Sequence, residues 1–158
     1  MVKSSLLALV VVGMAWSQNV PTTPIPEKYL AELVEVCTEY DVPIQYMARL
    51  AWWESRWDET AIVENQNGTR DVGLCGLNSA SAGDFARWYN DGRPYDPMTW
   101  RDNLRIGAAH LRAMRDATGS WVWAVMAYNM GLRGWQEWRD GEREISESTI
   151  KLVEAVFG

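Results

Sequence analysis

The chain of 158 residues has one histidine, two cysteines and no cluster of basic residues. His110, the only histidine, has no cysteine or carboxylate at metal-ligand spacing, so we expect a packing role and no metal site. Nothing in the sequence indicates a cofactor. The net charge of −6 and the lack of a basic patch argue against nucleic acid as a partner. An acidic protein is also not attracted electrostatically to anionic cell-wall polymers.

A long hydrophobic run is missing as well. Residues 1–17 have the features of a secretory signal, with Lys3, an apolar run from Leu6 to Met14, and the small-x-small site Ala15-Trp16-Ser17. The apolar run is shorter than the about 20 residues of a membrane span. We predict an exported protein of the periplasm or cell envelope, cleaved after Ser17; the competing interpretation is an uncleaved membrane anchor. No cysteine lies near the cleavage site, which argues against a lipoprotein.

The rest of the chain has neither internal repeats nor a convincing strand pattern. Residues 18–26, with three prolines, are expected to form an extended lead-in. Residues 27–158 are expected to form one domain. Apolar residues at helical spacing predict helices at Glu27 to Tyr40, Pro43 to Arg56, Ala80 to Tyr89, Thr99 to Thr118, Trp121 to Met130 and Ser146 to Phe157. The fold class predicted is therefore all-α, or at most a mainly helical α+β.

The sequence also predicts a buried central helix, a short helical piece and two irregular segments. The helix Trp121 to Met130 is apolar on nearly all sides, which is typical of the buried centre of a domain. A short helical piece is expected around Trp135. The stretch Asp58 to Val72 is predicted to be a polar loop. The segment Gly73 to Asn78 is too short and glycine-rich for a helix, so we expect its backbone to approach a ligand or another part of the chain.

Tryptophan is abundant, with ten residues in the chain. Trp52, Trp53 and Trp57 surround one carboxylate, Glu54, at the end of a predicted helix. Apolar surroundings and the negative end of the helix dipole both disfavour an ionised carboxyl, so the pKa of Glu54 should rise. A glutamic acid that is protonated near neutral pH can act as the proton donor in cleavage of a glycosidic bond. The alternative is a solvated Glu54 with the tryptophans in the core.

Three stretches in order along the chain resemble the motifs of one enzyme family. They are Glu54-Ser55 with Ala61 downstream, Gly73-Leu74, and the run Ala127-Tyr128-Asn129-Met130-Gly131. Together they resemble the lytic transglycosylases of the soluble-lytic-transglycosylase (SLT) family, which have a lysozyme-like fold. The pattern Asp96-Pro97, Asn103-Leu104, Gly107, Leu111 is similar to the helix between the second and third motifs. The resemblance extends over about Ile44 to Val156.

The resemblance implies a mechanism with a single catalytic acid and base, Glu54. This residue would protonate the oxygen between N-acetylmuramic acid and N-acetylglucosamine, while the acetamido group of the substrate stabilises the sugar carbon. Glu54 would then take a proton from the 6-hydroxyl, closing a 1,6-anhydro ring without water. The resemblance further implies that Tyr128 hydrogen-bonds Glu54 and that Ser55 and Asn129 support the site. Gly73, Leu74 and Asn78 are the expected substrate-binding residues of the second motif.

Several departures from the family pattern leave alternatives open. Cys75 and Gly76 stand where the family has Met-Gln or Phe-Gln, so the polar contact of that glutamine is absent, and Leu152 stands where a tyrosine is common. A non-catalytic peptidoglycan-binding scaffold is therefore an alternative. Another is a muramidase that uses water, in which Asp71 would face Glu54 across about 6.5–9.5 Å. We expect Asp71, like Asp58, Glu59 and Glu64, to lie in solvent instead.

Four further expectations concern the substrate, the partners, the cysteines and the tryptophans after the third motif. The substrate class is peptidoglycan glycan strands. The lack of a wall-binding module suits a monomeric helper enzyme that opens the wall for a secretion or conjugation machine or for a phage. Cys37 and Cys75 form a disulfide or remain buried thiols, with the sequence favouring neither. Trp135 and Trp138 are expected to line a distal sugar subsite.

Overall fold

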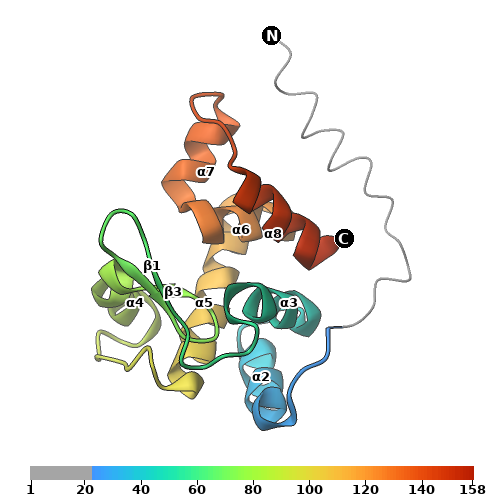
Figure 1. Cartoon of the computed structure of the whole chain (residues 1–158), viewed down its shortest axis with the longest axis vertical. Coiled ribbons are helices and arrows are strands. Elements are labelled where there is room, and N and C mark those ends of the chain that lie inside the picture. Colours follow the sequence, from blue (N-terminus) through green and yellow to red (C-terminus); the bar gives the residue numbers. More distant parts are fainter. Residues whose placement is uncertain (1–22) are drawn as a thin grey trace.

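A computed structural model describes residues 23–158 (Figure 1). The predicted signal sequence, its cleavage after Ser17 and the competing membrane anchor lie outside the described residues, as does the lead-in up to residue 22. Residues 23–26 have no regular structure, and the backbone N–H of Thr23 donates to Oε1 of Gln45 at 3.2 Å. None of the helices in the described part is long and apolar enough to span a bilayer.

Helices form most of the molecule, and a small sheet lies on one side of them (Figure 1). The predicted helices are confirmed to within a few residues, including the short piece around Trp135. In chain order the elements are α2 (Glu27–Glu39), α3 (Ile44–Ser55), β1 (Ile62–Glu64), β2 (Arg70–Val72), β3 (Leu77–Asn78), η1 (Ser79–Ser81), α4 (Ala82–Tyr89), α5 (Trp100–Thr118), α6 (Trp121–Met130), α7 (Leu132–Arg139) and α8 (Glu147–Phe157).

Local capping explains where two of the helices begin. The hydroxyl of Ser120 accepts a hydrogen bond from the N–H of Trp123 at 3.2 Å, so α6 begins directly after it. The hydroxyl of Ser146 accepts from the N–H of Thr149 at 3.1 Å at the start of α8. Each bond satisfies one of the N–H groups that the first turn of a helix leaves unpaired.

The sheet was not predicted, and the expectation of a polar loop from Asp58 to Val72 is wrong for its strands. The three antiparallel strands lie in the order β1-β2-β3, with Val63 opposite Asp71 and Asp71 opposite Asn78. Each strand has two or three residues, and all of β1 is exposed. Such short strands give no alternation of apolar and polar residues to recognise. The fold is therefore the mainly helical variant with a small sheet.

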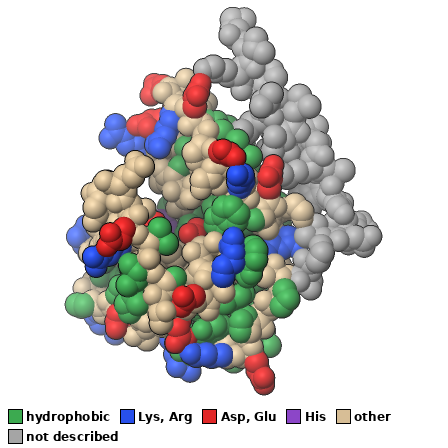
Figure 2. Space-filling view, viewed as in Figure 1, with side chains coloured by type: hydrophobic (Ala, Val, Ile, Leu, Met, Phe, Trp, Pro, Cys, Tyr) green, Lys and Arg blue, Asp and Glu red, His purple; other side chains and the backbone are tan. Residues whose placement is uncertain are grey.

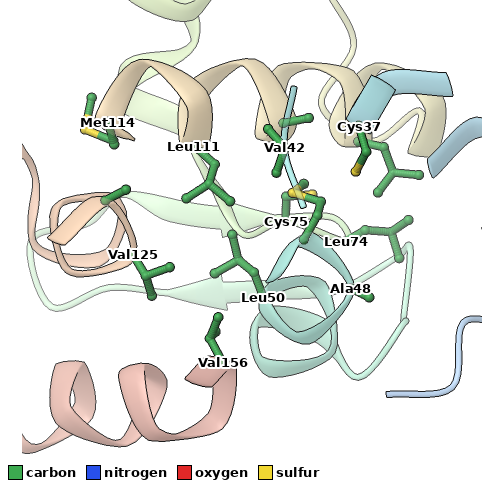
Figure 3. Packing of buried hydrophobic residues seen from close by; sticks show 14 of the residues in the cluster. Cys37, Val42, Ala48, Leu50, Leu74, Cys75, Leu111, Met114, Val125 and Val156 are labelled. Atoms are coloured by element: carbon green, nitrogen blue, oxygen red, sulfur yellow. The ribbon is translucent and has the colours of Figure 1, made fainter. Parts of the chain in front are cut away.

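The core is built around α6, as its apolar sequence predicts. Four consecutive residues of this helix, Ala124 to Ala127, are buried, and α5, α7 and α8 pack against it. Figure 3 shows Leu74 and Cys75, from the turn between β2 and β3, among the core side chains next to Leu50 of α3. Gly107 of α5 makes room for this turn, because a Cβ there would lie 2.6 Å from Sγ of Cys75.

The cysteines and the histidine have packing roles in this core. Cys37 and Cys75 are both buried free thiols, which answers the question of their pairing. His110 lies between α4 and Tyr128, and its Nδ1 is 2.9 Å from the hydroxyl of Tyr89. Burial lowers the pKa of His110 to about 4, so the ring is neutral at pH 7. The expected packing role of His110 is confirmed.

Candidate active site

Glu54 lies in the last turn of α3 and is only partly accessible to solvent. Burial raises its pKa to about 8, and the negative charge of Asp71 adds to the increase. The backbone of Gly76 lies close to this carboxylate, because a Cβ at position 76 would lie 2.6 Å from Oε2 of Glu54 and 3.3 Å from its Cβ. A larger residue does not fit at position 76 with the carboxylate where it is. The raised pKa agrees with the prediction from sequence.

Two of the tryptophans next to Glu54 in the sequence pack on other residues. Trp52 is 42% exposed and lies under the guanidinium of Arg56, 3.8 Å from the ring centroid. The ring of Trp57 stacks on Tyr29 at 5.7 Å between centroids. A backbone segment and a carboxylate from the sheet therefore contribute to the environment of Glu54.

The end of α3 is fixed directly after the candidate acid. Arg56 has φ +57° and Trp57 has φ +63°, a left-handed backbone conformation that residues other than glycine rarely adopt. The guanidinium of Arg56 donates from Nη1 to the carbonyls of Trp52 at 2.6 Å and Trp53 at 2.8 Å. The carbonyl of Trp52 also accepts from the backbone N–H of Arg56 at 2.8 Å, so the backbone and the side chain of Arg56 together hold the turn that carries Glu54.

The turn between β2 and β3, residues 73–76, is attached to the same helix end. The hydroxyl of Ser55 lies 3.0 Å from the carbonyl of Ala51 and 3.1 Å from that of Leu74, so its hydrogen is shared between the two. Ser55 thus supports the site by joining the end of α3 to the turn. The side chain of Leu74 is fully buried, so only its backbone could take part in the expected binding of substrate.

Gly73 is also required by packing. Its φ is +73°, and a Cβ would collide with the side-chain amide of Asn103 and lie 2.9 Å from the carbonyl oxygen of Pro97. Gly73 is buried, so its expected contact with substrate has no support in this geometry. Glycine at position 73 lets the turn approach α5 closely.

Asn103 is the central residue that sequence reasoning did not assign to the site. It is completely buried, and its Oδ1 accepts from the N–H of Cys75 at 2.8 Å. Its Nδ2 donates to the carbonyls of Val72 at 2.9 Å and Pro97 at 2.7 Å. The sequence did contain a sign of this role: Asn103 lies on the same helix face as Gly107, within the pattern that resembles the family.

Tyr128 contacts the turn and not the carboxylate. Its hydroxyl donates to the carbonyl of Cys75 at 2.8 Å, so its single hydrogen does not go to Glu54, as the resemblance implied. Burial, together with the negative charges nearby, raises the pKa of Tyr128 well above its usual value, so the hydroxyl stays protonated. Tyr128 therefore fixes the backbone that carries Gly76.

The two asparagines of the predicted site have structural partners. Oδ1 of Asn129 accepts from the hydroxyl of Thr149 at 2.6 Å, which joins α6 to the first turn of α8. Asn78 lies on β3, where its Nδ2 donates to Oδ1 of Asp71 at 2.8 Å. Trp135, an expected sugar contact, is only 4% exposed and is a core residue.

The surface is hollowed between the β1–β2 hairpin and α7 (Figure 2). Among residues 23–158, no three His, Cys, Asp or Glu side chains lie close enough together to hold a metal ion. Glu54, with its pKa of about 8, is a candidate proton donor.

Comparison with known proteins agrees with this arrangement. The fold is similar to that of an inactive mutant of the lytic transglycosylase Slt from Pseudomonas aeruginosa, with a TM-score of 0.69 and 21% identity. The match covers 94% of this chain and 26% of that one, so the chain spans about a quarter of that enzyme. No curated protein matches. The family model described as Transglycosylase SLT domain matches residues 34–151, well over half of the sequence. The chain therefore belongs to the Transglycosylase SLT domain family.

Proposed function

We propose that the protein is a peptidoglycan lytic transglycosylase with Glu54 as its single acid and base. The observation that carries this proposal is the pKa of Glu54, about 8, in a chain of this family. A group with this pKa is protonated at pH 7 and still gives up its proton readily, as a general acid that later acts as a base must do.

In the proposed reaction Glu54 donates its proton to the oxygen between N-acetylmuramic acid and N-acetylglucosamine. The bond from C1 to this oxygen breaks, its electron pair stays on the oxygen, and positive charge develops at C1, where the acetamido group of the substrate stabilises it. The carboxylate of Glu54 then takes the proton of the 6-hydroxyl. The 6-oxygen bonds to C1, the anhydro ring closes, and Glu54 is protonated again.

The place of Gly76 supports an active site with an altered second motif. The family's glutamine is replaced by a residue whose backbone lies directly against the carboxylate of Glu54. Close protein backbone excludes water from one side of the carboxyl group, which favours its protonated form. The departure thus removes a polar contact to substrate and helps to prepare the acid.

Location and partners follow from the substrate. Peptidoglycan lies outside the cytoplasm, so we propose that the protein acts in the periplasm or cell envelope. It would act as a monomeric helper that opens the wall locally for a secretion, conjugation or phage machine. The signal sequence at residues 1–17 remains part of this proposal.

A second candidate function is a muramidase of the same fold that uses water. The charge of Asp71 acts on Glu54, which places a second carboxylate in the neighbourhood of the acid. Glycosidases that use water pair an acid with a second carboxylate. The two functions differ in their products, since water leaves a reducing end and the internal 6-hydroxyl leaves an anhydro end.

Replacement of Glu54 by glutamine tests both enzymatic functions against a non-catalytic scaffold. Glu54→Gln keeps the shape of the side chain and removes the proton that is transferred. We expect the release of soluble glycan from purified peptidoglycan to fall at least about 10²-fold, the contribution of a general acid. The matched control is Glu142→Gln, the same change at an exposed residue after α7, which should keep the parent rate. A Glu54→Gln variant as active as the parent would exclude Glu54 as the catalyst.

A further inference from the structure

His110 has one nitrogen that the packing of the core does not use. Its Nδ1 is 2.9 Å from the hydroxyl of Tyr89, and no group in the described part of the chain bonds to its Nε2. This nitrogen is also not among the completely buried polar side-chain atoms without a partner, which belong to Trp57, Tyr95 and Trp135. Nε2 of His110 is therefore open to solvent or to a bound molecule.

The ring of His110 lies at the hollow between the β1–β2 hairpin and α7. Figure 2 shows histidine surface, in purple, inside this hollow, and the chain has one histidine. The imidazole is partly accessible, and its centroid is 5.1 Å from that of the ring of Tyr128. The hydroxyl of Tyr128 holds the carbonyl of Cys75, directly before Gly76, which lies close to Glu54. One edge of the imidazole is therefore open to the hollow, one aromatic contact away from the residues that hold this turn.

Tyr89 determines which nitrogen of the ring carries the hydrogen. Burial raises the pKa of Tyr89 to about 12 and lowers that of His110 to about 4, so at pH 7 the hydroxyl keeps its proton and the imidazole is neutral. Among the described residues, the hydroxyl of Tyr89 has no other acceptor, so it donates to Nδ1. A hydrogen bond at one ring nitrogen fixes the tautomer, so Nε2 carries the hydrogen and is a donor.

We propose that Nε2–H of His110 donates to an uncharged oxygen of the glycan strand, a hydroxyl or the carbonyl of an acetamido group, and that Tyr89 is the positioning residue for this contact. The inference rests on the proposed function for the identity of the ligand. A neutral donor suits sugar oxygens, because they carry no charge. The side-chain amide of the family's glutamine is also a neutral donor, so His110 supplies a contact of the kind that Gly76 removes.

The tautomer is measurable in the intact protein, because ¹⁵N labelling of histidine marks a single residue. In a chain produced without a histidine tag, we expect long-range ¹H–¹⁵N spectra at pH 7 to show a protonated Nε2 and an unprotonated Nδ1. Tyr89→Phe removes the donor to Nδ1, so the preference for this tautomer should weaken. The matched control is Tyr46→Phe, which removes a hydroxyl that has no hydrogen-bond partner in the described structure and should leave the spectrum of His110 unchanged.

Binding is measured with glycan strands freed of their stem peptides, added to the Glu54→Gln protein so that they are not cleaved. We expect the Nε2 resonance of His110 to shift on binding, together with backbone resonances around the hollow. Addition of His110→Phe keeps an aromatic ring and removes the donor, so the dissociation constant should rise about 3- to 10-fold, the contribution of one neutral hydrogen bond. Addition of Tyr46→Phe instead should leave the affinity as it is in Glu54→Gln alone.

The inference is wrong if Nδ1 carries the hydrogen in the free protein, or if the glycan shifts backbone resonances and leaves Nε2 unchanged. Both measurements use the native His110, so they do not depend on the folding of a variant at this position. A shift of Nε2 in a protein whose parent releases no soluble glycan would support the contact and contradict only the catalytic part of the proposed function. If the glycan moves no resonance at all, neither proposal holds.

Discussion

Among the single residues, Glu54 has the most unusual environment. Its pKa of about 8 lies far above the usual value of 4.5, with burial as the main cause and the charge of Asp71 as the second. Between these two pH values the folded protein binds a proton on Glu54 that the unfolded chain has released. The free energy of unfolding therefore decreases as the pH rises from 4.5 to about 8.

Replacement of Glu54 makes this relation measurable. In the parent, the free energy of unfolding should decrease between pH 4.5 and 8 relative to that of Glu54→Gln, which has no carboxyl to titrate. From pH 4.5 to above pH 8, the parent should lose roughly 5 kcal/mol of stability relative to the variant. Urea unfolding of both proteins at pH 5 and pH 8.5 checks this, and the titration of His110 is common to both. Equal pH dependence in the two proteins would contradict the raised pKa.

Gly76 is the second residue with a sharp prediction. In Gly76→Ala the new Cβ would lie 2.6 Å from Oε2 of Glu54, the mobile end of a side chain, so the carboxylate has to move while the fold remains. We expect at least about a tenfold loss of activity, because a general acid must keep its position. The rate of release of soluble glycan measures this effect.

Gly92→Ala is the control for backbone strain. Gly92 has φ +74°, and a Cβ added there would have no atom within 4 Å. Gly76 has φ +58°, and a Cβ added there would meet Glu54. Both variants lose about 1–2 kcal/mol to the left-handed conformation. Only Gly76→Ala should lose activity. An equal loss in both variants would show that strain, and not the displaced carboxylate, is the cause.

The sequence predicted a raised pKa for Glu54 but not all of its causes. Tryptophans next to it in the chain suggested apolar surroundings, yet Trp52 and Trp57 pack on Arg56 and Tyr29. The carboxylate meets Gly76, 22 positions further on, and such a contact depends on the path of the chain between them. No pattern in the sequence near Glu54 therefore predicts its contact with Gly76.

At the scale of elements, the turn formed by residues 73–76 is held from three helices. Ser55 at the end of α3 donates to the carbonyl of Leu74, and Asn103 of α5 accepts from the N–H of Cys75. Tyr128 of α6 donates to the carbonyl of Cys75. Residues of the first and third motifs, together with Asn103 between the second and third, thus support the turn that carries the second motif and places Gly76 close to Glu54.

Asn103 is the support with the largest predicted effect on stability. Asn103→Leu leaves the N–H of Cys75, the buried carbonyl of Val72 and the partly buried carbonyl of Pro97 without this partner, which we expect to cost about 2–4 kcal/mol. The melting temperature should fall by roughly 5–15 °C. Differential scanning calorimetry measures this change.

The matched control for Asn103 is Asn90→Leu. Nδ2 of Asn90 also donates to backbone carbonyls, those of Arg93 at 2.8 Å and Pro94 at 3.3 Å, but it does so in an exposed loop. Water replaces such bonds, so this variant should melt within a few degrees of the parent. Equal losses in both variants would contradict a special role of Asn103.

The helices could be predicted from the sequence, whereas the sheet could not. Apolar spacing over ten or more residues defines α5 and α6, and Ser120 and Ser146 mark helix starts. The strands are short, and β1 has exposed Ile62 and Val63. Their stability comes from pairing with residues elsewhere in the chain, which a window of sequence does not contain.

At the scale of the whole molecule, a helical body and a small sheet enclose a hollow, and the acid comes from the helical body (Figures 1 and 2). The family could be recognised from the order of three motifs, and the fold follows from the family. The mutual arrangement of Glu54, Asp71 and Tyr128 could not be predicted, because it depends on how β2 and α6 pack against α3. Tyr128 shows this most clearly, since its expected partner was Glu54 and its partner is Cys75.

Mass spectrometry of the soluble products from purified peptidoglycan tests the central claim most directly. The protein is used as the chain from Gln18 onward, with Glu54→Gln as the inactive control. A lytic transglycosylase must release fragments that end in 1,6-anhydro-N-acetylmuramic acid, and this is the result that we predict. Fragments heavier by one water, with reducing ends, would contradict it and establish a muramidase. Folded protein that releases no fragments would contradict both enzymatic functions and leave the scaffold.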